Sequence, residues 1–225
     1  MKISIHQPQY IPWMPYFAKI KEADLFVLLD HVEFQKNGLQ NRNQIKSSSG
    51  ANWLTVPVVQ SLGQKINAVE TVGHMNWQAK HWNTIRHSYS KSKYFKTYAD
   101  EIEEVYQLKW NNLCELNCHL LKKLCKWLEI DTPMVLSSEY NLSSSGTDLV
   151  HEICSLNGAT SYISGIGGKN YLDESKFVES GIELIYRPPI ILNEYPQPFP
   201  KVGFVGSLSA IDVIFNCGNT WKDYI

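Results

Sequence analysis

The first thirty residues alternate between strand-like and helix-like segments, and this order limits the folds that the chain can adopt. Residues 2–7 favour a strand, and residues 15–23 favour a short helix that starts at Pro15, where a missing N–H does no harm. Residues 24–30 (DLFVLLD) are nearly all apolar, as in a strand that is buried on both faces. A strand, a helix and a second strand in this order predict a parallel pair with a right-handed crossover.

Two prolines stiffen the segment that follows the first strand, which reads HQPQYIPW over residues 6–13. A proline fixes its own φ and disfavours helix at the preceding residue, so this segment is predicted to be a rigid loop. Polar and aromatic side chains on such a loop, at the carboxyl end of a strand, are typical of ligand sites in α/β proteins. We therefore expect a ligand site that contains His6, Gln7, Gln9, Tyr10 and Trp13.

Three regions follow this start. Residues 31–75 are polar and contain strand-like segments at 39–46, 52–58 and 65–72, which predict an antiparallel extension. Residues 76–131 carry apolar side chains at helical spacing and predict a helical insertion, in which Asn76 can cap the first helix and 99–130 forms one long helix or two. After residue 132, alternating helix and strand patterns return, with strands at 160–164 and 182–186 and a last helix at 207–215.

Together these patterns predict an α/β fold with a Rossmann-like, mainly parallel sheet, an antiparallel extension and a helical insertion. We expect a single domain over residues 1–225, in which 1–75 and 132–225 form the α/β core with its extension and 76–131 form the insertion. The content of 44% hydrophobic and 19% charged residues is typical of a folded protein of this kind.

Charge and composition indicate which partners the protein can attract and in which cellular compartment it resides. The formal net charge of −1 provides no overall field that would attract nucleic acid or an acidic membrane surface. The apolar run at 25–29 has only the length of a strand, and the start of the chain lacks the apolar region of a signal peptide. We therefore predict a cytoplasmic protein without membrane insertion.

The chain has five cysteines, an odd number, and they include no C-x-x-C pair. This argues against a disulfide framework, and no metal site is predicted.

Two strand ends suggest a catalytic pair. His6 and Asp30 each lie at the carboxyl end of a predicted parallel strand, so both are expected at the same edge of the sheet. A carboxylate can hold an imidazole in one tautomer and raise its basicity, which would make His6 a general base. The competing interpretation is a histidine bonded to backbone and an aspartate that caps a turn.

Three further groups could bind substrate. Asn41, Arg42 and Lys46 offer amide, guanidinium and ammonium donors for a phosphate or carboxylate, although a solvated strand face would look the same. The loop that contains Gly165, Gly167, Gly168 and Lys169 lies between a predicted strand and a helix, where backbone N–H groups could bind an anion; a tight turn is the alternative. His81 shares an apolar helix face, where a semi-buried structural histidine is the simpler interpretation.

Several segments resemble the WbqC-like family from one end of the chain to the other. They are HQPQYIPWMPYFAKI, ADLFVLLDHVEFQKN, NRNQIKSSSGANWLTVPV, YISGIGGKNYL and SLSAIDVIFNCG. Members of this family are found in gene clusters for O-antigen and other surface polysaccharides, and transfer of glycine or another amino acid to an amino sugar has been suggested for them. The family's motif positions correspond to His6, Gln7, Pro8, Tyr10, Pro12, Trp13, Asp30, Asn41, Arg42, Lys46, Trp53, Pro57, Gly165, Gly168, Tyr171 and Asp212.

The resemblance implies a transferase that attaches an amino acid or acyl group to the amine of a nucleotide-linked amino sugar. In this hypothesis Arg42, Lys46 and the loop at 165–169 hold phosphates, Tyr10 and Trp13 stack on the base or sugar, and His6, oriented by Asp30, deprotonates the amine. The donor would be an aminoacyl-tRNA, a carrier thioester or an ATP-activated amino acid, and no cofactor is predicted.

Two alternatives remain open at this stage. One is a non-catalytic module that binds a sugar nucleotide. The other is a nucleotidyl- or adenylyl-transferase, because the order of strand, motif, helix and apolar strand is similar to that of HIGH-type enzymes. However, residues 13–16 read WMPY at the place of the H-x-G-H-like pair, so that pair is missing.

Overall fold

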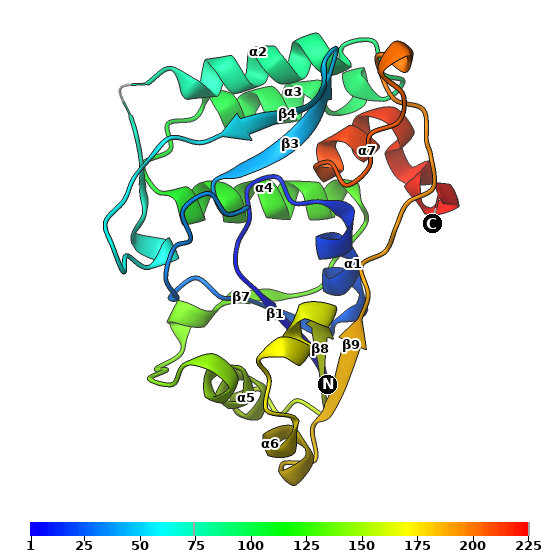
Figure 1. Cartoon of the computed structure of the whole chain (residues 1–225). Helices are drawn as coiled ribbons and strands as arrows, with labels where there is room; N and C mark the ends of the chain where they lie inside the picture. The colour runs from blue at the N-terminus through cyan, green and yellow to red at the C-terminus, as the bar shows by residue number, and fades with distance from the viewer. Residues whose placement is uncertain (74, 225) are drawn as a thin grey trace. The chain divides into compact units, whose positions relative to one another are not determined.

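The computed structural model describes residues 1–73 and 75–224 of the chain (Figure 1). Two compact units divide the chain, and each is assembled from three separate segments. Unit 1 comprises residues 1–8, 15–32 and 130–190, and unit 2 comprises residues 9–14, 33–129 and 191–225.

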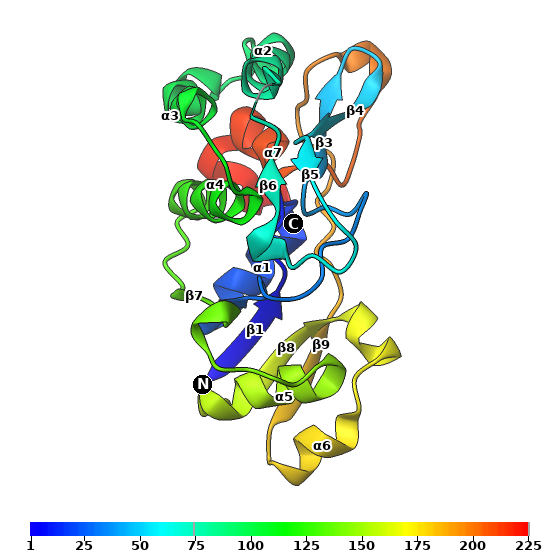
Figure 2. The same cartoon turned by 90° about the vertical axis from the view of Figure 1, so that its left-hand side faces the viewer.

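Unit 1 contains a five-stranded sheet in which every neighbouring pair is parallel. Its strands are β1 (Lys2–His6), β2 (Leu25–Leu28), β7 (Met134–Leu136), β8 (Ser161–Gly165) and β9 (Glu183–Arg187), arranged in the order β7-β2-β1-β8-β9. Figure 2 labels β7, β1, β8 and β9 of this sheet. Counted along the chain within this unit, the order is 3-2-1-4-5, which is the order of a Rossmann-type sheet. The prediction of a Rossmann-like, mainly parallel sheet is therefore confirmed.

Helices cover both faces of this sheet because side chains alternate along each strand. On one face, Ile3, Ile5 and Val27 pack against α5 (Gly146–Leu156) and α6 (Glu174–Glu179). On the other face, α1 (Met14–Glu22) brings the Tyr16 ring to 5.4 Å from the Phe26 ring, measured between centroids. As a result, both faces are apolar, which explains why residues 24–30 read as a continuous apolar run.

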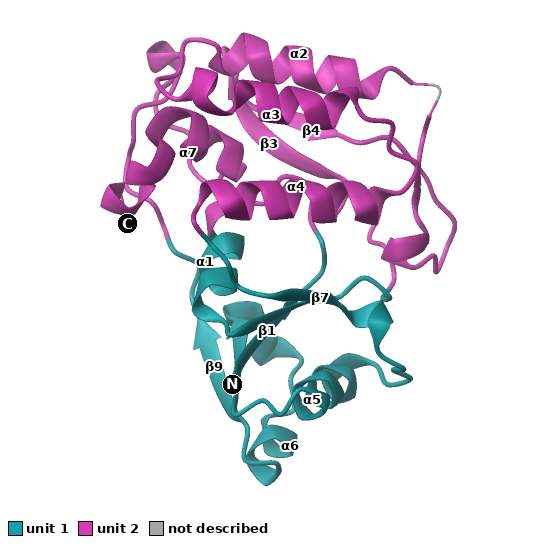
Figure 3. Ribbon diagram, turned by 180° about the vertical axis from the view of Figure 1, so that it is seen from behind, with its two compact units in different colours: residues 1–8, 15–32, 130–190 teal, residues 9–14, 33–129, 191–225 magenta. Residues whose placement is uncertain are grey.

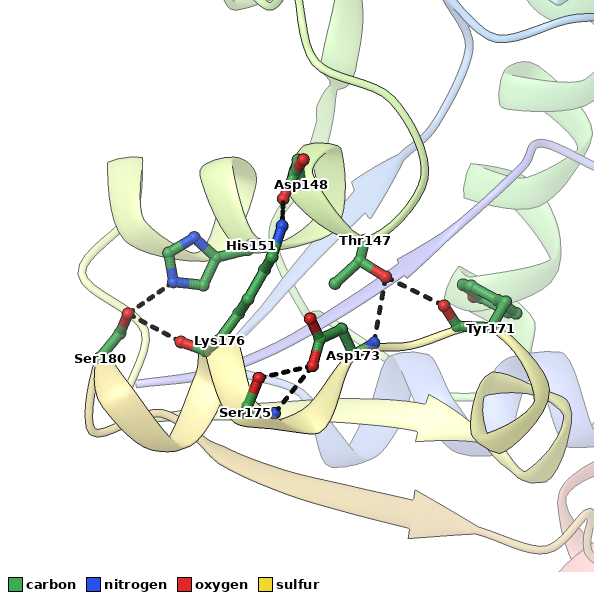
Figure 4. Close-up of polar contacts among 8 residues, drawn as sticks. All are labelled: Thr147, Asp148, His151, Tyr171, Asp173, Ser175, Lys176 and Ser180. Atoms are coloured by element: carbon green, nitrogen blue, oxygen red, sulfur yellow. Dashed lines mark hydrogen bonds and ion pairs between the residues drawn. The ribbon is translucent and has the colours of Figure 1, made fainter.

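Polar contacts hold α5 and the α6 region together at the outside of unit 1 (Figure 4). Lys176 forms an ion pair with Asp148, and the Asp173 backbone N–H donates to the Thr147 hydroxyl at 3.1 Å. The Asp173 carboxylate also accepts from the Ser175 backbone N–H at 3.2 Å, so Asp173 caps the N-terminus of α6.

Within its described residues, unit 2 combines a β-hairpin with a group of α-helices (Figure 3). The hairpin pairs β3 (Arg42–Ser47) with β4 (Gly50–Thr55), and the two-residue strands β5 (Val58–Val59) and β6 (Glu70–Thr71) form a second antiparallel pair. The helices are α2 (Trp77–Tyr89), α3 (Phe95–Gln107), α4 (Leu113–Trp127) and α7 (Ala210–Cys217). The antiparallel extension and the helical region are thus both present.

Some local predictions differ from the structure. Residues 65–72 were expected as a strand, but Ile66–Ala68 form a 3-10 turn, which buries Ile66 and Val69 at the three-residue spacing of such a turn. The helical pattern at 99–130, predicted as one long helix or two, forms two helices, α3 and α4. The Asn112 side chain caps α4 by accepting from the Glu115 N–H at 3.1 Å. Asn76 precedes α2 but makes no side-chain capping bond. In the described residues, no helix is long and apolar enough to cross a membrane.

Candidate ligand-binding site

The sheet of unit 1 has a topological switch point between β1 and β8. From β1 the chain continues to β2 on one side, whereas from β8 it continues to β9 on the other side. Ligands of open α/β sheets bind at the carboxyl ends of the strands that flank such a point. His6 ends β1 and is followed by Gln7 and Pro8, and Gly165 ends β8 and is followed by the segment Ile166–Asn170, so both predicted loops of unit 1 lie at the expected edge.

His6 ends β1 and is held in one tautomer. Its Nδ1 lies 3.1 Å from the Gln7 carbonyl oxygen, which can only accept, so Nδ1 carries the proton and Nε2 carries the lone pair. The Tyr16 ring packs edge-on against the His6 ring at 4.8 Å between centroids. Burial lowers the pKa of His6 to about 3, and the positive charge of Lys19 adds to this effect. The imidazole is therefore neutral near pH 7.

Lys19 is a functional candidate that sequence reasoning missed. It lies three residues after Tyr16 on α1, so the two side chains are neighbours on the helix. Burial lowers the pKa of the Lys19 ammonium to about 8. The sequence feature that could have identified Lys19 is its position between Phe17 and Ile20, two apolar residues that are completely buried in the structure.

Asp30 joins the end of β2 to the end of β7. Its Oδ1 accepts from the Ser137 hydroxyl and the Ser138 backbone N–H, both at 2.9 Å, and its Oδ2 accepts from the Ser138 hydroxyl at 2.6 Å. Both serines directly follow β7. A buried carboxylate with such donors is a rigid part of the sheet edge. Whether it also orients His6, as the sequence suggested, stays a prediction.

His31 is a second missed candidate at this edge. Its Nδ1 lies 2.6 Å from the Ser137 Oγ. The single hydroxyl proton of Ser137 is donated to Asp30, so the Ser137 oxygen accepts from His31 Nδ1–H. His31 follows Asp30 directly, and a histidine at that place had no distinguishing pattern in the sequence.

The glycine loop folds as a 3-10 helix over Ile166–Asn170. A Cβ at Gly168 would overlap the Ser164 Oγ and would lie 3.0 Å from the Leu172 Cδ1, so close packing requires this glycine. At Gly165 and Gly167 a Cβ would meet no neighbouring atom within 4 Å. The Lys169 Nζ lies 5.2 Å from the centroid of the Tyr186 ring. Anion binding by this loop stays a prediction.

The other predicted residues lie in unit 2, where Tyr10 and His81 share a buried network. His81 Nε2 donates to the Thr55 carbonyl at 3.2 Å, so its Nδ1 accepts from the Tyr10 hydroxyl at 2.8 Å. The Tyr106 hydroxyl lies 2.5 Å from that of Tyr10 and completes the chain. Because Tyr10 is fully buried, this arrangement fixes the path of the segment 9–14.

Two cations from the sequence prediction also have partners in unit 2. The Arg42 guanidinium donates to the Asn37 carbonyl at 2.5 Å and lies 4.4 Å from the centroid of the Trp53 ring. The Lys46 ammonium donates to Gln197 Oε1 at 3.0 Å. Burial lowers the pKa of Lys46, and the negative charge of Asp212 opposes this shift. Lys46 is almost fully buried.

Three other residues of unit 2 that the sequence predicted for the site are Gln9, Trp13 and Asn41. Asn41 Nδ2 donates to the Val56 carbonyl at 2.9 Å. Trp13 forms an isolated β-bridge with Ser209. Gln9 Oε1 and Asn41 Oδ1 are buried and have no hydrogen-bond partner within residues 1–73 and 75–224. A substrate-binding role for these side chains remains untested.

Fold and site thus define an α/β protein with a Rossmann-type sheet and a polar switch-point edge. The chain belongs to the WbqC-like protein family, which it matches over residues 7–224. It is 34% identical over 228 residues to "Uncharacterized protein Rv1507c" of Mycobacterium tuberculosis (strain ATCC 25618 / H37Rv), and this similarity covers 100% of this chain and 97% of the relative. No solved structure matches the chain.

Proposed function

We propose that this protein is a cytoplasmic enzyme of surface-polysaccharide biosynthesis. It transfers an amino acid, such as glycine, or an acyl group to the amine of a nucleotide-linked amino sugar. The observation that carries the nucleotide part is the 3-2-1-4-5 strand order with polar loops after both strands of the switch point. The transfer reaction itself is supported by membership of the WbqC-like family, whose members are found in gene clusters for surface polysaccharides.

The proposed reaction requires a base at the sheet edge. The sugar amine attacks the acyl carbon of the donor, an N–C bond forms, and the bond from that carbon to the oxygen or sulfur of the carrier breaks. The attacking nitrogen loses a proton, which His6 Nε2 accepts and then passes to the leaving oxygen or sulfur. An aminoacyl-tRNA or a carrier thioester would serve as the donor.

The surroundings of His6 must change for this step. With a pKa of about 3, His6 is a weak base in the ligand-free protein. An anionic group that neutralises the nearby Lys19 charge would remove one of the two causes of this low pKa. Ligand binding would therefore raise the pKa of His6 toward the range of a useful base.

The test compares binding and turnover in wild type, His6→Ala and a control, His151→Ala. UDP-linked amino sugars are titrated by calorimetry, and products formed with glycyl-tRNA or a glycyl thioester are detected by mass spectrometry. We expect the His6→Ala variant to retain binding and to lose at least 100-fold in turnover, in line with typical general-base contributions.

Three results would contradict the proposal. Absence of nucleotide-sugar binding to the wild type would remove the substrate class. Binding without any product would favour the non-catalytic module. ATP-dependent pyrophosphate exchange without acyl transfer would favour an adenylyl-transferase.

A further inference from the structure

β9 is the last strand of the unit 1 sheet, and its outer edge has no neighbouring strand among the described residues (Figure 1). The Glu183 N–H donates to the Thr160 carbonyl at 3.0 Å, so the backbone N–H and C=O of Glu183 point toward β8. This direction alternates along a strand, which turns the N–H and C=O groups of Leu184 and Tyr186 toward the outer edge. No hydrogen bond joins these four groups to any part of residues 1–73 and 75–224.

The outer edge of β9 is short, because both of its ends are closed. Before the strand, the Ile182 N–H is bonded to the Phe177 carbonyl at 2.8 Å. After it come Pro188 and Pro189, which have no N–H to donate. The edge therefore offers a pair of backbone donors and acceptors at two positions separated by one residue, and it fits a partner strand with the same spacing.

A second copy of β9 has this spacing when it runs antiparallel, with a two-fold axis through Ile185. Leu184 would then exchange both backbone hydrogen bonds with Tyr186 of the partner subunit, and Tyr186 would do so with the partner subunit's Leu184. The two Ile185 residues would face each other across the axis as a non-hydrogen-bonded pair. In this register Glu183 lies directly opposite Arg187 of the partner subunit, at a Cβ separation of roughly 4.5–5.5 Å.

The charges of the strand ELIYR are therefore self-complementary in the antiparallel direction. Glu183 is exposed, and its carboxylate forms no ion pair within residues 1–73 and 75–224. Arg187 binds Glu22 of its own chain through Nε and Nη2, at 2.8 and 2.6 Å. A guanidinium has five N–H donors, so Arg187 retains donors for a second carboxylate.

The opposite face of the β9 edge supplies apolar surface. A groove of about 450 Å³ lies between β9 and α6, and its lining includes Leu184, Tyr186 and Val178. Val178 is 77% exposed, although it is apolar. Residues that face each other in an antiparallel pair point to the same side of the sheet, so the partner subunit's Tyr186 would lie against Leu184 beside this groove. Pairing would thus bury apolar side chains in addition to joining backbone groups.

We propose that two copies of this chain associate through their β9 edges, so that the parallel sheet of unit 1 continues into the partner across an antiparallel junction. The inference does not depend on the proposed function. The paired strands are only five residues long. Because such an interface is smaller than that of a permanent dimer, the association is weak and depends on protein concentration.

The first test measures the mass of the full-length protein by analytical ultracentrifugation from about 10 μM to 1 mM, where weak association is detectable. We expect the wild type to dimerise and Glu183→Arg or Arg187→Glu to weaken the dimer at least tenfold. An equimolar mixture of the two variants should recover it, because each introduced charge then meets an opposite charge. Asp131→Arg, at an exposed position of unit 1, is the control for net charge and should change association less than twofold.

The second test uses the residue on the proposed axis. Ile185→Cys places two thiols opposite each other, at a Cβ separation close to that of a disulfide. On mild oxidation it should form a covalent dimer at least tenfold faster than Leu156→Cys, which carries its thiol at an exposed position of α5.

Several results would overturn the inference. They are a wild type that stays monomeric up to the highest concentration, undiminished association of Glu183→Arg, and a mixture of charge variants that associates no better than either alone. Equal cross-linking of Ile185→Cys and Leu156→Cys would do the same. Glu183→Arg leaves the bond between Arg187 and Glu22 in place, so it separates the interface from the stability of the strand.

Discussion

The ring of Tyr16 lies edge-on against the ring of His6, with centroids 4.8 Å apart and an interplanar angle of 63°. The same tyrosine donates its hydroxyl proton to the Gln7 carbonyl oxygen, which also accepts from His6 Nδ1. Helix α1 is thus attached to the residues that follow β1 by a ring contact and a hydrogen bond. Because Tyr16 belongs to α1 and contacts the His6 ring, the packing of α1 and the orientation of the imidazole depend on the same side chain.

Tyr16→Phe should separate these two contributions. The variant keeps the ring contact with His6 and loses the hydroxyl, so we expect a loss of about 1 kcal/mol in the free energy of unfolding, measured by urea denaturation. Tyr16→Ala removes the ring as well and should cost about 3–5 kcal/mol. Tyr171→Phe, at an exposed position, serves as the control. Equal stability of Tyr16→Phe and wild type would show that the hydroxyl bond contributes nothing.

Gly168→Ala should destabilise unit 1, whereas Gly167→Ala should not. A Cβ at position 168 would overlap the Ser164 side chain and crowd Leu172, while a Cβ at 167 would meet open space. We expect a loss of about 1–3 kcal/mol for Gly168→Ala, measured as a lower urea midpoint. The double variant Gly168→Ala/Ser164→Ala should recover part of that loss. A Gly168→Ala protein as stable as wild type would contradict the packing explanation.

Lys19→Met should stabilise the ligand-free protein at neutral pH. The pKa of Lys19 is lowered from 10.5 to about 8, so the unfolded chain binds more protons than the folded protein between these values. Stability therefore rises with pH through this window, and the charged lysine costs the fold on the order of 1–3 kcal/mol below it. Urea unfolding at pH 7 and pH 10 measures this: the advantage of Lys19→Met should be present at pH 7 and nearly absent at pH 10.

His6→Gln should reduce the sensitivity of the fold to acid. The pKa of His6 is lowered from 6.5 to about 3, so the unfolded chain binds the extra proton as pH falls through this range. The wild type loses this stability between about pH 6.5 and 3, by up to about 4 kcal/mol. His81, with a pKa lowered to about 4, still contributes in the variant. Parallel acid-unfolding curves for His6→Gln and wild type would refute the expectation; His151→Gln is the control.

Tyr89→Phe should destabilise unit 2 through its buried polar network. The Tyr89 hydroxyl donates to Asp212 Oδ1 at 2.7 Å and accepts from the Lys46 backbone N–H at 2.9 Å. Removal leaves a buried acceptor and a buried donor without this partner, which should cost about 1–3 kcal/mol in thermal or urea unfolding. The control Tyr98→Phe loses a 3.3 Å bond in an exposed position and should change stability little. Similar losses in both variants would show that burial of the network is unimportant.

The parts of the fold that sequence reasoning predicted are those with local signals. The first strand, α1 and β2 follow from an apolar run and a proline at the start of a helix. In contrast, β7 is only three residues long, and its pairing with β2 depends on residues more than one hundred positions earlier. Too few apolar positions are available in such a strand to establish a period.

The candidate site could be predicted only in part for a related reason. Both loops of the switch point were found, because each directly follows a strand. The division of the HQPQYIPW segment between two units after Pro8 has no local signal, since it depends on where later segments of the chain pack. Similarly, the sequence shows Lys46 and Asp212 as separate charges, and only long-range packing places both in one buried network.

The interleaving of the two units also sets the order in which the chain can fold during synthesis. Ser4 of β1 pairs with Ile163 of β8, so the centre of the parallel sheet cannot close until most of the chain has been made. At ribosomal rates of about 5–20 residues per second, the apolar strands β1 and β2 wait roughly 8–30 s for this partner. During that interval their unpaired edges are exposed to aggregation, which makes the nascent chain dependent on early collapse or on chaperones.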